Sequence, residues 1–254
     1  MEEIVHRLTL LPADQWPEVI AALMDGLKQK EVLLYAHDPV VAAQLHAYGW
    51  DGSLEMNTLA DTLLWVDANM AALKTDSVMQ RALSYTIRGE GDGNAVATVR
   101  MQYKNTGHFG AFTTRYRSYV RVYVPEGSTL IRVDGSLADD KTKNPTRAPS
   151  PVAVSTELGR TVYGFFVAVE PGESRTVSVS YRLPAYIPAQ VSRGIYRLFL
   201  WKQAGMPTIP LTLDMHFDKT VIRATPAETK NHWFDRAYQW TGTLAQDMTV
   251  GIGF

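Results

Sequence analysis

The chain has 254 residues, of which 46% are apolar and 20% charged, and its formal net charge is -1. This composition excludes a disordered chain and gives no overall attraction to nucleic acid, and the length allows one large or two modest domains with buried cores. The absence of cysteine excludes disulfides, thiolate metal sites and thiol nucleophiles. We therefore expect no nucleic-acid partner, and the lack of recognisable ligand motifs predicts no metal and no cofactor.

The N-terminal part shows alternating helical and strand patterns. Trp16, Ile20 and Leu23 recur at helical spacing and predict a helix over residues 14–30, and the apolar run 32–36 predicts a short strand. A second helix is expected to begin at Pro39 with Asp38 as its N-cap and to end at Gly49, before another strand over 62–66. These elements form a small helix-strand-helix-strand unit, which we assign to residues 1–80.

A set of polar residues follows the strand predicted over 62–66. That strand is apolar on both parities, which is typical of a strand covered on both faces of a sheet. The polar side chains beyond it are expected to converge at one end of the sheet: Asp67, Asn69, Lys74, Asp76 and Arg81. We favour a structural set of caps and ion pairs, and the alternative is a phosphate- or sugar-handling active site.

From residue 81 onward the pattern becomes one of hairpins. Short alternating strands are separated by Gly- and Pro-containing turns, as in Leu83 to Ile87 and Val177 to Leu183. This predicts an antiparallel, immunoglobulin-like β-sandwich over 81–254, with a mobile proline-rich loop over about 135–151. The fold class expected for the whole chain is α+β, mainly β, with the small N-terminal unit packed on the sandwich or followed by it.

Basic and aromatic residues share one side of the strand predicted over 115–124. Tyr116, Val120 and Val122 have the other parity and should face the core. The outward stripe consists of Arg115, Arg117, Tyr119, Arg121 and Tyr123. Guanidinium groups grip anionic groups and aromatic rings stack on sugars, so the stripe is a candidate binding surface. The alternative is a solvated strand face whose arginines pair with acids on the next strand.

Several segments follow one another in the order seen in a known bacterial family. They are Lys30-Glu-Val-Leu-Leu-Tyr-Ala-His-Asp38, Gly49-Trp-Asp-Gly52, Asp67-Ala-Asn69 with Lys74-Thr-Asp76, and Tyr119-Val-Arg-Val-Tyr-Val-Pro125. Together they resemble the C-terminal part of the uncharacterised family known as domain of unknown function 4012. The turn Glu170-Pro-Gly-Glu173 and the closing Tyr181-Arg-Leu-Pro184 are similar to hairpins of immunoglobulin-like surface modules.

The family resemblance implies a location outside the cytoplasmic membrane and bears on whether the protein is an enzyme. Members usually carry a membrane-spanning segment and a further domain ahead of this region, so the chain is expected to be the outer part of a longer protein or a short member. No apolar run here approaches the ~18 residues of a transmembrane helix, so we expect no membrane insertion by this chain, though a preceding segment could anchor it. No catalytic residues are established for the family.

These observations predict an extracytoplasmic, cell-surface module of the bacterial envelope. Its expected role is non-enzymatic binding, adhesion or assembly, with anionic cell-wall glycan or another surface protein as partner. The alternative is an enzyme acting on envelope polymers, with its site at Asp67, Asn69, Lys74 and Asp76.

Overall fold

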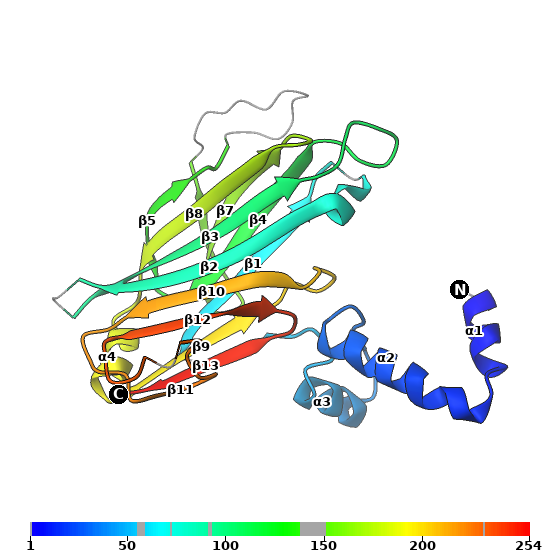
Figure 1. Cartoon of the computed structure of the whole chain (residues 1–254), viewed down its shortest axis with the longest axis horizontal. Coiled ribbons are helices and arrows are strands. Elements are labelled where there is room, and N and C mark those ends of the chain that lie inside the picture. Colours follow the sequence, from blue (N-terminus) through cyan, green and yellow to red (C-terminus); the bar gives the residue numbers. More distant parts are fainter. Residues whose placement is uncertain (1, 55–58, 72, 91–92, 138–150, 231) are drawn as a thin grey trace. The chain divides into compact units, whose positions relative to one another are not determined.

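The computed structural model describes residues 2–54, 59–71, 73–90, 93–137, 151–230 and 232–254 (Figure 1). The chain divides into two compact units, one formed by Met1–Ser53 with Gln203–Met206 and the other by Leu54–Lys202 with Pro207–Phe254. Strands take up 46% of the chain and helices 18%, so the predicted mainly-β class is confirmed. We call the unit that contains Met1–Ser53 the helical unit and the unit that contains Leu54–Lys202 the β unit.

The helical unit contains short helices joined by turns. Its elements are α1 (Glu2–Thr9), the 3-10 helix η1 (Ala13–Gln15), α2 (Trp16–Lys28) and α3 (Pro39–Ala47). The Asp38 side chain caps α3 by accepting hydrogen bonds from the amides of Val40 and Val41, at 2.9 and 3.0 Å. Gly49 follows the helix with a φ of 69°, a value that suits glycine. The second predicted helix is therefore confirmed at both ends.

The strand predicted over residues 32–36 is wrong. This segment is irregular, and its cross-segment backbone bond runs from the Leu34 amide to the Trp50 carbonyl at 2.8 Å. An apolar run predicts burial, but a strand also needs a partner along its length, which local pattern cannot supply. The boundary between the units falls at Ser53 and Leu54 rather than at residue 80, because the strand predicted over 62–66 belongs to the β unit.

The β unit consists of two sheets. The seven-stranded sheet has the order β11-β13-β9-β1-β4-β7-β6, and the six-stranded sheet has the order β12-β10-β2-β3-β8-β5. A short helix, α4 (Tyr186–Ser192), and a 3-10 helix, η2 (Lys74–Val78), lie between strands. The strands are β1 (Asp61–Asn69), β2 (Met79–Gly89), β3 (Ala95–Asn105), β4 (Tyr116–Pro125), β5 (Thr129–Asp134), β6 (Ala153–Glu157), β7 (Arg160–Val169), β8 (Ser174–Arg182), β9 (Ile195–Trp201), β10 (Ile209–His216), β11 (Arg223–Thr225), β12 (Ala237–Leu244) and β13 (Met248–Gly253).

The sheets pack face to face around a core rich in tyrosine. The indole of Trp65 on β1 donates to the Tyr103 hydroxyl on β3 at 2.9 Å, and the rings of Tyr163 and Tyr181 lie 5.8 Å apart across the two sheets. Buried tyrosines need partners for their hydroxyls, and two carboxylates on the core face of β1 supply them. These are Asp61 and Asp67, both buried.

The wholly antiparallel sandwich predicted from the hairpins is wrong, although the β-rich, two-sheet arrangement agrees with a sandwich. In the seven-stranded sheet β1 pairs with β9 in parallel, and in the six-stranded sheet β10 pairs with β2 in parallel. Such pairs need a long connection rather than a hairpin turn. The tip of the loop predicted to be mobile, residues 138–150, lies outside the described residues.

The outer faces of the two sheets differ. On the six-stranded sheet, the outward positions are mainly polar, as with Gln102 and Lys104 on β3 and Thr176 on β8. The seven-stranded sheet instead carries an apolar cluster on its outer face, made by Leu64, Tyr123, Val162 and Trp201. This is why β1 and β7 are apolar on both parities, as their sequences indicated.

Candidate functional site

The structure places the predicted stripe of β4 on the outer face of the seven-stranded sheet. Tyr116, Val120 and Val122 are fully buried on the core side, whereas Arg117, Tyr119 and Arg121 are partly exposed on the other side. Tyr123 shares their parity but is only 5% exposed, because it packs in the apolar cluster. Arg115 precedes the strand and pairs with Glu170. The exposed part of the stripe is therefore short, because Arg115 at one end is ion-paired and Tyr123 at the other end is buried.

Beside this patch lies a hollow of about 320 Å³. Its floor crosses four neighbouring strands, because Ala68 on β1 pairs with Tyr119, Phe166 on β7 pairs with Tyr119 from the other side, and Ala153 on β6 pairs with Gly164 on β7. Small side chains stand between larger ones along this row. The surface is hollow there because the alanine and glycine residues of this row have little side-chain volume, while larger side chains stand around them.

Two aromatic rings form one wall of the hollow. The rings of Tyr119 and Phe166 meet edge to face, with centroids 4.9 Å apart. Tyr119 also lies across Gly164, where a Cβ atom would stand 2.3 Å from the tyrosine hydroxyl. Glycine at residue 164 therefore lets the Tyr119 ring lie close to the sheet.

An ion pair lies at the other side of the hollow. Nη1 of Arg121 is 3.4 Å from a carboxylate oxygen of Glu157, and the Tyr123 hydroxyl donates to the same oxygen at 2.9 Å. The side chains of Arg121 and Glu157 are 40% and 39% exposed, so both remain accessible to a ligand. The hollow thus presents a guanidinium, a carboxylate and aromatic rings within one small surface.

The second predicted set does not converge as a whole. Asp67, Asp76 and Arg81 are brought together. The Arg81 side chain is 2% exposed and donates through Nε to Asp67 at 3.1 Å, and through Nη2 to Asp76 at 2.6 Å and to the Tyr116 hydroxyl at 2.8 Å. Asp67 lies within β1, not beyond its end, and also accepts from Tyr103 at 2.8 Å and from Ser118 at 3.0 Å.

Burial and the neighbouring groups act in opposite directions on the pKa values of this network. Burial raises the pKa of Asp67, while the Arg81 charge and the Tyr103 and Ser118 hydrogen bonds oppose that shift. Burial alone would lower the pKa of Arg81, but Tyr116, Asp67 and Tyr103 raise it overall. The arrangement gives Arg81 and Asp67 a structural role, because their polar atoms point into the protein core.

Asn69 and Lys74 lie apart from that network. Asn69 accepts from the Ala71 amide at 3.0 Å and donates to the Leu73 carbonyl at 3.1 Å, so it organises the turn after β1. The Lys74 ammonium lies 5.8 Å from the centre of the Phe112 ring. These contacts are local, as expected for caps and turns.

The residues of the hollow that were missed in the sequence include Glu157, Gly164 and Phe166. The run over 160–169 indicated burial on both faces, but it could not place its outward residues beside Tyr119 and Arg121. A glycine within an apolar strand was the one local signal of a close approach.

Within the described residues, no group of three His, Asp or Glu side chains lies close enough to hold a metal ion. The helices of the same described part include none that is both long and apolar enough to cross a membrane.

Comparison with known proteins gives only weak likenesses. No protein-family model matches the chain, and no curated protein matches it. Similar solved structures include a candidate nutrient binding protein of Legionella pneumophila (9% identity, TM-score 0.36, 76% of this chain and 70% of that one). Others are leukotriene A4 hydrolase of Saccharomyces cerevisiae (10%, 0.35, 73% and 31%) and an M1 zinc metallopeptidase of Deinococcus radiodurans (11%, 0.32, 74% and 44%). The chain thus spans less than half of the last two, and we draw no function from similarities this low.

Proposed function

We propose that the β unit is a non-enzymatic binding module of the bacterial cell envelope that holds a glycan on the outer face of its seven-stranded sheet. The observation that carries the proposal is the hollow in which the Arg121–Glu157 pair lies opposite the rings of Tyr119 and Phe166. A sheet face is a rigid platform, and rigid placement lowers the entropy lost on binding.

The chemistry of the hollow suits a sugar that carries a negative charge. Aromatic rings cover the apolar face of a sugar, while a carboxylate accepts from hydroxyl groups and a guanidinium donates two parallel hydrogen bonds to a carboxylate or phosphate. Arg117 lies on the same face of β4 as Arg121 and adds positive charge beside the hollow. The other class of partner is a neighbouring surface protein, and the test below distinguishes it from a glycan.

The extracytoplasmic location is part of the same proposal. It rests on the resemblance of the ordered segments to the envelope family and of the 170–184 hairpin to immunoglobulin-like surface modules. The immunoglobulin-like assignment belongs to this proposal as well, with the two parallel strand pairs as a departure from that pattern.

The envelope-polymer enzyme is less well supported. Of the polar set that contained its predicted site, Asp67 and Arg81 are buried and hydrogen-bonded to one another. Because a catalytic group must reach its substrate, a pair enclosed between two sheets is poorly placed for chemistry.

The test is binding of the purified chain to isolated bacterial wall polymer across a salt series. We expect salt-sensitive binding by the unmodified chain and at least about a tenfold loss, or ~1.4 kcal/mol, in an Arg117→Glu, Arg121→Glu variant. The reason is that the variant replaces the guanidinium groups facing the polymer with groups that repel it.

A matched control changes the same charge on the other sheet. Arg100→Glu with Arg132→Glu alters two exposed arginines of the six-stranded sheet and should leave binding within about twofold. If both double variants lose polymer binding equally, the loss is caused by net charge and not by the position of the arginines. If the unmodified chain does not bind the polymer at any salt concentration, the glycan proposal fails and a protein partner should be sought.

A second variant tests the shape of the hollow without changing charge. Gly164→Ala places a Cβ 2.3 Å from the Tyr119 hydroxyl, a clash that forces the tyrosine ring to move. We expect polymer binding to weaken about threefold to tenfold, with the free energy of unfolding changed by less than about 1.5 kcal/mol, since the atom displaced ends a flexible side chain. Unchanged binding would show that the Tyr119 ring position is irrelevant to the ligand.

A further inference from the structure

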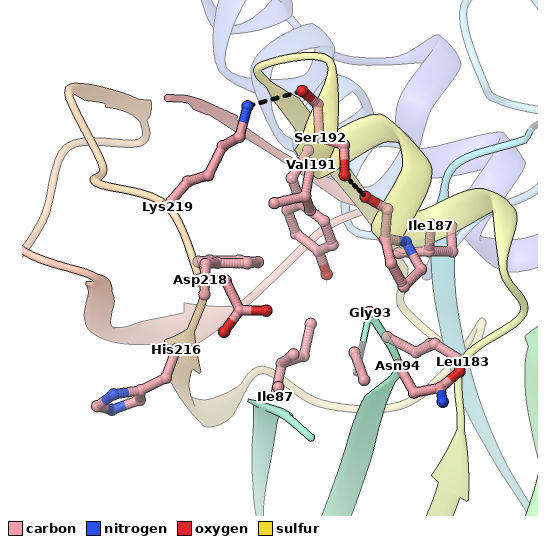
Figure 2. A pocket seen from close by; sticks show the side chains of 15 residues that line it. Ile87, Gly93, Asn94, Leu183, Ile187, Val191, Ser192, His216, Asp218 and Lys219 are labelled. Carbon is pink, nitrogen blue, oxygen red and sulfur yellow. Dashed lines mark hydrogen bonds between the residues drawn. The ribbon is translucent and has the colours of Figure 1, made fainter. Parts of the chain in front are cut away.

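A separate cavity of about 270 Å³ lies in the β unit beside helix α4 (Figure 2). It forms where β2 and β10 end, β3 begins, and the chain passes from β8 into the helix. None of its lining residues lies in the hollow on the seven-stranded sheet. A ligand bound here would therefore be distinct from the proposed glycan.

The walls of this cavity are largely apolar. Ile87 comes from β2, Leu183 follows β8, and Ile187 and Val191 lie one turn apart on α4. Phe217 closes another side and packs on Tyr196, with ring centroids 5.2 Å apart. Apolar walls around a cavity of this size favour the hydrocarbon body of a small molecule.

A carboxylate stands at this apolar space. Figure 2 shows the Asp218 side chain pointing into the cavity between Ile87 and the helix. Asp218 is a solvent-exposed residue, and it makes no hydrogen bond or ion pair with any described residue. It passes close to Gly89, where a Cβ atom would lie 3.1 Å from its Oδ1 atom. A glycine at the end of β2 therefore leaves room for this carboxylate.

Two other titratable residues that line the cavity, Lys219 and His216, have partners of their own. The Lys219 ammonium donates to the Ser192 carbonyl at 2.7 Å, at the C-terminal end of α4, where a cation is favoured. His216 turns away from the cavity and lies 3.1 Å from the Asp214 carboxylate on the outer side of the sheet. Of these three side chains, Asp218 is the one without a partner among the described residues.

We propose that this cavity binds a small primary amine with an apolar body. The ammonium group pairs with Asp218, and the alkyl or aryl body fills the space between Ile87, Val191 and Phe217. An ionised carboxylate only accepts hydrogen bonds, so its best complement is a cationic donor, and such charge-assisted bonds are about twice as strong as neutral ones. The same charge repels a carboxylate ligand of equal shape.

The experiment titrates the full chain at pH 7 with hexylamine, hexan-1-ol and hexanoate, using ligand-observed NMR for Kd. These three probes share a body and differ in their head group. We expect hexylamine to bind with a Kd on the order of 1 mM, hexanol more weakly and hexanoate least. No binding of hexylamine up to about 20 mM, or equal binding of all three probes, would overturn the proposal.

Variants then assign the ammonium site. Asp218→Asn keeps the side-chain size and removes the charge, so it should weaken hexylamine at least about tenfold and change hexanol by less than about twofold. Asp134→Asn removes an equal charge from the exposed strand β5 and should change neither probe. Hexylamine binding that survives Asp218→Asn unchanged contradicts the proposal, whatever the glycan experiment gives. The Arg117→Glu, Arg121→Glu variant should still bind hexylamine.

Val191→Phe tests the apolar part of the site independently. A larger side chain on the helix face fills the cavity and should abolish binding of both hexylamine and hexanol. A folded Val191→Phe protein that binds both probes as before would place them elsewhere on the molecule and overturn the assignment.

Discussion

Arg81→Met is expected to lower the free energy of unfolding of the β unit by about 3–5 kcal/mol. Arg81 and Asp67 have side chains that are each only 2% exposed, and their atoms lie 3.1 Å apart. Removing the guanidinium leaves a buried carboxylate without its cationic partner, although the Tyr103 and Ser118 hydroxyls still donate to it. Urea unfolding followed by circular dichroism measures the change, and the slope should stay constant if only stability is altered.

Asp76 provides the matched control for this prediction. It accepts from the same guanidinium at 2.6 Å, but its side chain is 51% exposed. Because solvent replaces most of a surface ion pair, Asp76→Ala should cost less than about 1 kcal/mol. Similar losses for Arg81→Met and Asp76→Ala would contradict the view that burial makes this network important.

A double variant separates the pair from its surroundings. Asp67→Asn keeps an acceptor for Tyr103 and Ser118 while removing the charge, so Asp67→Asn with Arg81→Met should lose less stability than the sum of the single changes. Strict additivity would mean that Arg81 acts through Tyr116 and Asp76 instead of through Asp67.

Asp61→Asn is expected to remove a pH-dependent part of the stability. Asp61 is completely buried and accepts from the hydroxyls of Tyr85 and Tyr196 at 2.7 and 2.6 Å. Burial raises its pKa to about 6, against the opposing effect of those hydrogen bonds and of the Thr62 amide. No cation lies among these partners, whereas Asp67 pairs with Arg81.

The sign follows from which state holds the proton. Between the ordinary value of 3.8 and about 6, the folded protein keeps a proton on Asp61 that the unfolded chain has lost. The stability that this group contributes is therefore complete below about pH 4 and is lost as the pH rises through 6, by on the order of 3 kcal/mol.

The measurement compares unfolding curves of the two proteins from pH 4 to pH 7. Other carboxylates titrate in the same range, but they cancel in the difference between the unmodified chain and Asp61→Asn. A difference that is constant with pH would contradict the prediction. Tyr196→Phe offers a second check. It removes a hydrogen bond to the ionised Asp61 carboxylate, so the pH at which Asp61 titrates in the folded protein should rise.

Local sequence patterns predicted much of the secondary structure. The Asp38 cap with Pro39 and Gly49 located α3, alternation located β2 and β8, and a strand apolar on both parities was correctly placed inside a sheet as β1. The parity of β4 also separated its core residues from the outward Arg and Tyr. These features depend on neighbours within a few residues, which is why the chain alone determines them.

The sites depended on contacts that no local pattern contains. Glu157 and Phe166 reach Arg121 and Tyr119 only through the pairing of β4 with β7 and β7 with β6, and the Asp218 cavity needs the unpredicted helix α4. The spacing of Ile187 and Val191, with Gly194 after the helix, was the one local signal for α4. The family resemblance and the envelope location stay predictions.

By itself, then, the sequence determined many of the helices and strands and the apolar side of strands such as β2, β4 and β8, but it missed α4 and wrongly predicted a strand over 32–36. The tertiary structure decided which strands are neighbours, including β1 beside β9, and thereby turned Asp67 and Arg81 from a possible reaction centre into a buried pair. The physical reason is that periodicity reports burial, which is a local property of one face. Pairing and polar networks depend instead on groups far apart in the chain, whose meeting is set by the packing of the whole core.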